Sequence, residues 1–288
     1  MKPHHLVTQV ARRLEAARLS YGHGTTCAWD EAAWLVLHAL GQPLDSSLDE
    51  SAPPPRISAL KKVATLMHAR IATRTPLAYL LREAWLQGIS FYVDERCIVP
   101  RSLLAEVIAD ASADPWLPAE CRRVLDLCCG GGSLAVLAAL AWPEMQVDAA
   151  DISADALDVA RINVERHGLQ QRIRLLQGDG LAACAGERYD LILCNPPYVN
   201  AESMASLPPE YAAEPALALA GGADGMDFIR PLLAHAAEHL TEGGVLLLEI
   251  GHEREHFEAA FPQLAPVWLP TSAGCEQVLL LTRDELLQ

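Results

Sequence analysis

The sequence predicts an α/β fold built on a mostly parallel, doubly wound sheet of seven strands. Beyond about residue 120, short apolar runs alternate with longer helical patterns, which is typical of parallel sheets covered by helices. An apolar fraction of 51% supports a large folded core. The first five strands are predicted at 123–128, 146–150, 173–177, 189–194 and 244–250, and helices at 133–141, 154–167, 226–240 and 253–261. Two further strands, 266–269 and 277–281, follow each other closely, so we expect them to pair antiparallel at one edge.

The first hundred or so residues are organised differently. Apolar residues at helical spacing predict helices over 5–19, 30–40 and 58–73, with a turn at 51–55. Residues 83–99 carry β-favouring side chains around Gly88, which predicts a hairpin. Ser102 is placed to cap a helix that runs through Ile108. We therefore expect a small helical domain over 1–82, a hairpin linker over 83–101 and the α/β domain over 102–288.

Cysteine spacing and the length of apolar runs exclude several classes of protein. Eight cysteines are scattered with no Cys-x-x-Cys pair, which favours reduced thiols in a cytoplasmic protein over disulfides or a zinc site. The ten histidines form no metal-binding motif, so no metal is expected. No apolar run reaches the roughly 18 residues of a membrane span, and residues 1–5 lack the apolar segment of a signal peptide. We expect a cytoplasmic protein with no membrane partner.

The charge is unevenly distributed along the chain. Residues 1–90 hold ten Lys or Arg and seven Asp or Glu, whereas residues 91–288 hold 12 and 30. An acidic main domain repels a phosphate backbone, which argues against DNA as a substrate and favours a basic partner. A need for solubility alone explains the excess of acidic residues about equally well. The charge therefore makes DNA a less suitable partner but does not identify the partner.

An apolar strand followed by a glycine-rich turn marks the first candidate site. The run 124–132 reads Val-Leu-Asp-Leu-Cys-Cys-Gly-Gly-Gly and leads into a predicted helix. Glycines let a backbone approach a ligand closely, and a helix N-terminus offers free N–H groups. Asp126, Cys128, Gly130 and Gly132 are therefore cofactor-binding candidates. Taken alone, such a loop also suits a dinucleotide, a nucleotide or a simple tight connection.

Two later strand ends extend this site. Asp151, followed by Ile152, ends the second strand, where an acid can accept hydrogen bonds from both hydroxyls of a ribose. Asp179, followed by Gly180, ends the third strand, where a carboxylate can accept from an exocyclic adenine amine. Helix capping is the alternative role for Asp151, and turn formation is the alternative for Asp179. Because ligands bind at the carboxyl ends of strands in open α/β sheets, we expect these residues to share one site.

The four residues Asn195-Pro196-Pro197-Tyr198 follow the fourth predicted strand and indicate chemistry on a planar nitrogen. The lone pair of an amide or aromatic amino nitrogen is delocalised, so an enzyme that alkylates it must hold both N–H bonds. The Asn195 side-chain oxygen and the Pro196 carbonyl are two suitable acceptors. Proline stiffens the loop, and the Tyr198 ring can pack on the planar group. Asn-Pro and Pro-Pro are also common in ordinary turns.

In this order, the parts resemble the class I S-adenosylmethionine-dependent methyltransferases, which have a Rossmann-like sheet. The resemblance implies that the glycine loop holds the methionine portion of S-adenosyl-L-methionine, Asp151 the ribose and Asp179 the adenine. Ile152, Gly180 and Asn195 complete the implied cofactor-binding set. A dinucleotide oxidoreductase is the competing interpretation of the fold, and the lack of a Gly-x-Gly-x-x-Gly motif disfavours it.

Over nearly its whole length, the chain resembles the protein-(glutamine-N5) methyltransferases. The segments that carry this resemblance are 75–80, 83–85, 91–96, 99–102, 105–106, 195–199, 207–211, 214–215 and 217–219. Pro100-Arg101-Ser102 and Cys128 depart from the pattern of the members that act on peptide release factors. These departures favour the branch that acts on ribosomal protein L-three of the large subunit.

The resemblance implies methyl transfer to the N5 atom of a glutamine in that basic ribosomal protein. Asn195, Pro196 and Tyr198 are the implied catalytic residues, and Pro197 and Arg101 join them as substrate-binding residues. The helical domain is expected to recognise the substrate and to contact ribosomal RNA in an assembly intermediate. The alternatives are methylation of release factors, methylation of an amino group on a nucleic-acid base, and a non-catalytic assembly factor.

Overall fold

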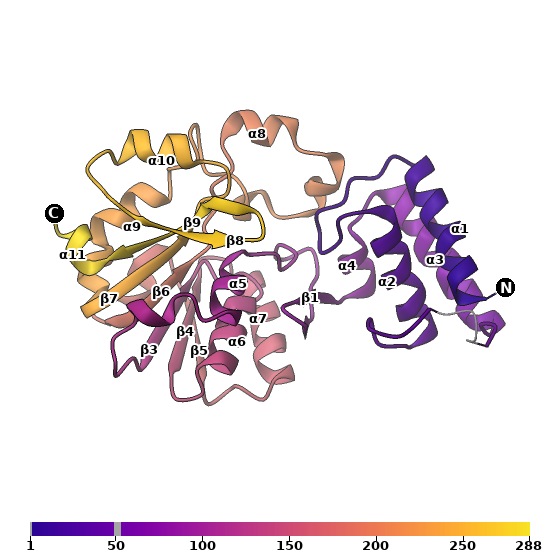
Figure 1. Ribbon diagram of the computed structural model, residues 1–288, viewed down its shortest axis with the longest axis horizontal. Helices are drawn as coiled ribbons and strands as arrows, with labels where there is room; N and C mark the ends of the chain where they lie inside the picture. The colour runs from indigo at the N-terminus through magenta and orange to yellow at the C-terminus, as the bar shows by residue number, and fades with distance from the viewer. Residues whose placement is uncertain (1, 49–52) are drawn as a thin grey trace.

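The computed structural model describes residues 2–48 and 53–288, so residues 51 and 52 of the predicted turn lie outside the described residues. Helices come first along the chain and form a bundle to one side of the sheet (Figure 1). They are α1 (Pro3–Ala16), α2 (Ala28–Leu40), α3 (Ile57–Thr73) and α4 (Leu77–Leu81). The three predicted helices are confirmed with small shifts at their ends. The single-turn helix α4 was not predicted.

The predicted hairpin is confirmed but is shorter than expected. Strands β1 (Ala84–Leu86) and β2 (Ile89–Phe91) pair antiparallel over three residues each. The pairing ends there because the next residue, Tyr92, bonds to a side chain and not to a strand. Its N–H donates to Asn163 Oδ1 at 2.7 Å, and its carbonyl accepts from Asn163 Nδ2 at 3.0 Å.

A sheet of seven strands forms the rest of the molecule, in the order β5-β4-β3-β6-β7-β9-β8. Only β9 runs antiparallel to its neighbours within this sheet, so the predicted parallel sheet with an antiparallel edge is confirmed. The chain winds outward from β3 to β5 and then returns to β6, and such a reversal of strand order creates a crevice at the carboxyl ends. The strands are β3 (Arg123–Leu127), β4 (Gln146–Asp151), β5 (Ile173–Gln177), β6 (Tyr189–Cys194), β7 (Leu240–Glu249), β8 (Val267–Thr271) and β9 (Gly274–Thr282).

Helices cover both faces of this sheet (Figure 1). Two predictions need correction. The helix predicted over 226–240 begins only at Ile229 and becomes a 3-10 turn at Ala236, since Pro231 lacks an N–H and is tolerated only in a first turn. Ser102 lies one residue before the cap position of α5, but its hydroxyl accepts from Leu104 N at 3.2 Å, as a capping side chain does, and it also donates to Glu249 at 2.5 Å. The helices are α5 (Leu104–Ala109), α6 (Ser133–Ala141), α7 (Ala154–Arg166), α8 (Ala201–Ser206), α9 (Ile229–His235), α10 (Arg254–Ala260) and α11 (Arg283–Leu286).

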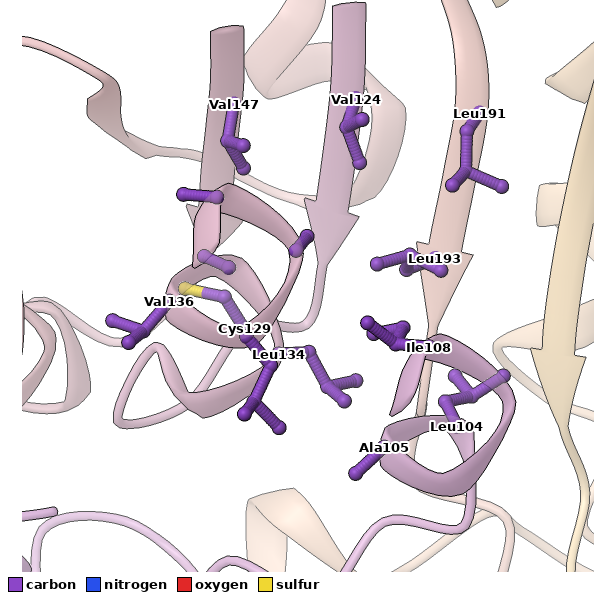
Figure 2. Packing of buried hydrophobic residues seen from close by; sticks show 14 of the residues in the cluster. Leu104, Ala105, Ile108, Val124, Cys129, Leu134, Val136, Val147, Leu191 and Leu193 are labelled. Carbon is purple, nitrogen blue, oxygen red and sulfur yellow. The ribbon is translucent and has the colours of Figure 1, made fainter. Parts of the chain in front are cut away.

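Alternating side chains of the strands build two apolar layers, one on each face of the sheet. On one face, Val124 and Leu193 pack with Leu104 of α5 and Leu134 of α6 (Figure 2). On the other face, the neighbouring strand residues pack against α9. This two-sided burial holds the strand ends rigidly in place, which suits them to carry a site. Among the described residues, no helix is long and apolar enough to cross a membrane.

Candidate active site

A first cavity opens at the carboxyl ends of the four strands β3, β4, β5 and β6. Three apolar residues that the sequence did not single out also form its walls: Ile98, Leu217 and Phe228. The cavity thus joins residues from the hairpin linker, the sheet and the segment beyond α8. The sequence-predicted residues that line it are Cys128, Gly130, Asp151, Ile152, Asp179, Gly180, Asn195 and Pro197.

Asp151 ties the end of β4 to the glycine loop. Its Oδ2 accepts from the N–H of Gly130 at 2.8 Å, and its Oδ1 accepts from the N–H of Ser153 at 2.9 Å. Burial raises the pKa of its carboxyl group, although these backbone donors oppose the shift. The capping residue of α7 is Ser153, whose hydroxyl accepts from Ala156 N, so capping does not account for Asp151.

Asp179 lines the first cavity just beyond the end of β5, the strand that pairs with β4. Its side chain is exposed, and its carboxylate makes no hydrogen bond within residues 2–48 and 53–288. The neighbouring Gly180 lies close to the Phe228 ring, since a Cβ atom added there would be 3.7 Å from it. The cavity therefore combines a free carboxylate with an apolar wall beyond the end of β5.

Asp126 and Gly132 were expected at the cofactor, but neither lines the first cavity. Asp126 is only 1% exposed, and its Oδ2 accepts from Ala135 N of α6 at 2.8 Å. Burial raises its pKa to about 8 despite this hydrogen bond. Gly132 has a φ of +75° and lies against α7, where an added Cβ atom would be 3.1 Å from Ala160 Cβ. Both residues therefore support the loop from behind.

A second cavity adjoins the first on the other side of Asn195. Within the described part of the chain, Asn195 is the only polar side chain that lines both cavities; Ile98 and Ala218 are apolar. Neither the Asn195 side chain nor the Pro196 carbonyl makes a hydrogen bond to any described residue. Two acceptors are therefore available at the junction. The sequence-predicted residues that line the second cavity are Arg101, Asn195, Pro196 and Tyr198.

Tyr198 belongs to the second cavity and does not line the first. Its hydroxyl donates to Glu249 Oε1 at 3.1 Å, while Glu249 Oε2 accepts from Leu103 N at 2.9 Å. Burial raises the pKa of both the Tyr198 phenol and the Glu249 carboxyl group. The tyrosine is thus held against the wall of the second cavity.

Arg101 lines the second cavity, but its charge already has a partner. The guanidinium donates to Glu214 Oε1 at 2.5 Å and to Oε2 at 2.7 Å. It also lies over the Tyr211 ring, 5.6 Å from the centroid. Arg101 therefore contributes shape and a paired charge to the cavity, and not a free cation.

Two residues of the second cavity escaped the sequence analysis. Glu249 lies next to the carboxyl end of the predicted strand 244–250, the same signal that marked Asp151, and could have been found by it. Gln277 is only 7% exposed, and its Oε1 is buried with no hydrogen-bond partner among the described residues. Gln277 begins the predicted strand 277–281, whereas ligands of open α/β sheets are expected at the carboxyl ends of strands, so its position carries no such signal in the sequence.

Comparisons with known proteins show which family the sequence belongs to. The family model of the methyltransferase small domain matches residues 103–207. A ribosomal protein uL3 glutamine methyltransferase of Bordetella pertussis is 54% identical over 98% of this chain and 95% of its own length. Another, of Burkholderia pseudomallei, is 50% identical over 98% of this chain and 94% of its own length.

The fold recurs in solved structures of low sequence identity. The hMettl16 catalytic domain, solved in complex with the MAT2A 3'UTR hairpin 6, is 13% identical with a TM-score of 0.52, covering 78% of this chain and 80% of that chain. That likeness concerns the fold alone. The two full-length relatives establish the family: the chain belongs to the ribosomal protein uL3 glutamine methyltransferases.

Proposed function

We propose that this enzyme transfers a methyl group from S-adenosyl-L-methionine to the side-chain amide nitrogen of a glutamine in ribosomal protein uL3. The observation that carries the proposal is the position of Asn195, whose side chain lies at the junction of two cavities and makes no hydrogen bond to any residue that the structure describes. A cofactor in one cavity and a glutamine in the other would meet at this residue. The names of the full-length relatives support uL3 as the substrate.

The residues of the first cavity fit S-adenosyl-L-methionine. The unpaired carboxylate of Asp179 suits an exocyclic adenine amine, and the apolar Ile152 and Phe228 suit the faces of a purine ring. Asp151 is placed for the ribose, with the glycine loop beside it for the methionine portion. When bound, the cofactor supplies an electrophilic methyl group on a positively charged sulfur.

Asn195 and Pro196 would orient the nitrogen of the glutamine. The Asn195 Oδ1 atom and the Pro196 carbonyl accept hydrogen bonds from the two N–H groups of the glutamine amide, which turns the lone pair of its nitrogen toward the first cavity. The N–C bond forms as the C–S bond breaks, and the same two acceptors stabilise the positive charge that develops on nitrogen. One proton then leaves the nitrogen for solvent, so no strong base is required before the transfer. Alignment of the two reactants supplies most of the remaining gain in rate.

We also propose a division of labour along the chain. Residues 1–82 would recognise the substrate, and residues 102–288 would catalyse the methyl transfer. Residues 83–101 would link these two domains. The basic balance of residues 1–90 supports contact with ribosomal RNA, and the acidic remainder supports docking of a basic protein. A ribosomal-protein substrate also supports a cytoplasmic location.

Mass spectrometry of methylated products tests the proposal directly. The enzyme is incubated with labelled S-adenosyl-L-methionine and, separately, with purified uL3, a peptide release factor, or ribosomal RNA. We expect one methyl group on a glutamine of uL3. A methylated release factor with unmodified uL3 would move the enzyme to the alternative branch. Label in RNA alone would assign it to base methylation.

A further inference from the structure

The segment 207–219 forms a wall that the two cavities share. Tyr211 and Leu219 line the second cavity, Leu217 lines the first, and Ala218 lines both. The segment is built of two short 3-10 helices, Pro209–Ala213 and Ala216–Ala218. The hydrogen bonds of such turns have poorer geometry than those of an α-helix, so the position of this shared wall also depends on contacts with other parts of the molecule.

Glu210 anchors the shared wall to the N-terminal helices. Its side chain is completely buried, and its Oε1 accepts from the N–H of Ser20 at 2.9 Å. The same oxygen lies 2.7 Å from an Arg74 nitrogen and 3.8 Å from an Arg70 nitrogen. Arg70 is itself buried and is held by Glu31 at 2.7 Å. A carboxylate of the wall thus lies in a pocket of donors that belong to the helical part of the chain.

Glu214 provides a second anchor about one turn further along. Its Oε1 accepts from the N–H of Val99 at 2.9 Å, and both of its oxygens bind the Arg101 guanidinium. His23 Nε2 lies 3.5 Å from its Oε2, and the His23 ring is 4.5 Å from the Tyr211 ring. Burial tends to raise the pKa of Glu214, but His23 and Arg101 outweigh it and hold the pKa at about 2. The wall is therefore fixed from the N-terminal helices and from the linker.

Glu210 and Glu214 are both buried charged groups, and the loss of one partner from a buried ion pair costs more free energy than the loss of one from an exposed pair. Removing one partner of a buried pair leaves the other charge without compensation, whereas an exposed ion pair contributes little. The wall should therefore move, or loosen, when one anchor loses its charge. A shift of about 1 Å in reacting groups is enough to slow a reaction by about 100-fold.

We propose that Glu210 and Glu214 are positioning residues for methyl transfer, through which the N-terminal helices set the geometry of both cavities. The helical part of the chain would then act on catalysis itself, besides any contact that it makes with the substrate. This inference rests on the proposed function of the two cavities. It separates two roles for the same helices: recognition alone changes the apparent affinity for uL3, whereas positioning changes cofactor binding and turnover.

The test compares Glu210→Gln with Glu202→Gln. Glu202 lies in the same region, in α8, but is exposed, so its variant controls for the loss of one acid. We measure the Kd for S-adenosyl-L-methionine by calorimetry without substrate, and kcat at saturating uL3. Glu210→Gln should weaken cofactor binding several-fold and lower kcat by about 10- to 100-fold, while Glu202→Gln should match the parent within twofold.

Unchanged Kd and kcat in Glu210→Gln, with a raised KM for uL3 alone, would overturn the positioning role. If Glu210→Gln does not fold, Arg74→Gln removes the same contact from its half-exposed partner, and the same pair of changes is expected. A parent enzyme that binds the cofactor but methylates no uL3 would instead overturn the proposed function. The two failures are therefore distinct.

Discussion

Gly251→Ala tests whether the position of Tyr198 controls turnover. Gly251 follows β7 with a φ of +55°, and a Cβ atom added there would lie 2.4 Å from Cε2 and 3.0 Å from Cζ of the Tyr198 ring. Carbon atoms in contact lie about 3.5–4.0 Å apart, so the ring must move by roughly 1 Å. That movement pulls the Tyr198 hydroxyl from Glu249 Oε1, which it now meets at 3.1 Å.

The expected effects follow from this displacement. A 1 Å shift next to the reacting groups lowers kcat by up to about 100-fold. The left-handed backbone costs about 1–2 kcal/mol for a residue with a Cβ atom, and overpacking costs about 1–3 kcal/mol. Each kcal/mol lowers Tm by about 2–4 °C for a chain near this size. Gly251→Ala should therefore be measurably less stable and much slower.

The assay is the initial rate of label transfer to saturating uL3, measured below the Tm of every variant. Gly186→Ala is the matched control, because Gly186 has a φ of +80° and an added Cβ atom there would meet nothing within 4 Å. The Gly186→Ala variant has the same kind of backbone strain but no steric clash with a neighbouring residue, so it should keep the kcat of the parent. A folded Gly251→Ala enzyme that turns over within threefold of the parent would refute the role assigned to Tyr198.

Three further predictions concern the junction of the cavities, the first cavity, and the residue Asp126 behind the glycine loop. Asn195→Ala should lower kcat by about 10²–10³-fold, the usual cost of losing one hydrogen-bond partner of the transition state. Calorimetry should show a nearly unchanged Kd for the cofactor, and a fall in kcat of only a few fold would contradict the role of Asn195. Asp151→Ala should weaken cofactor binding, because it removes the acceptor of the Gly130 N–H as well as the proposed contact with the ribose; an equal Kd would exclude Asp151 from that site. Burial raises the pKa of Asp126 from 3.8 to about 8, so between these pH values the unfolded chain loses the Asp126 proton while the folded protein keeps it. The free energy of unfolding of the parent therefore falls as the pH rises through this range, and Asp126→Asn should be increasingly more stable than the parent. Urea unfolding of both proteins across that range checks the sign, and a constant difference would contradict the burial argument.

Much of the fold was predictable because strands and helices of an α/β sheet are encoded by local patterns. The bounds of β5, β6 and α6 agree with the prediction. The errors arose where a distant group intervened. Asn163 of α7 bonds to both the N–H and the carbonyl of Tyr92, which shortens the hairpin. The Ser102 hydroxyl divides its bonds between Leu104 N of α5 and the distant Glu249, so its capping position is shifted by one residue.

The sequence by itself determined the components of the site. Parallel strands bring their carboxyl ends to one edge of the sheet, so Asp151, Asp179 and Asn195 had to gather there once the strands were recognised. The tertiary structure decided how these components are divided. It separated two cavities at Asn195, placed Asp126 behind the loop, and paired Arg101 with Glu214 across 113 residues of chain. Such pairings depend on which segments the fold brings together, and no local spacing encodes them, because burial and partner choice are properties of the packed molecule.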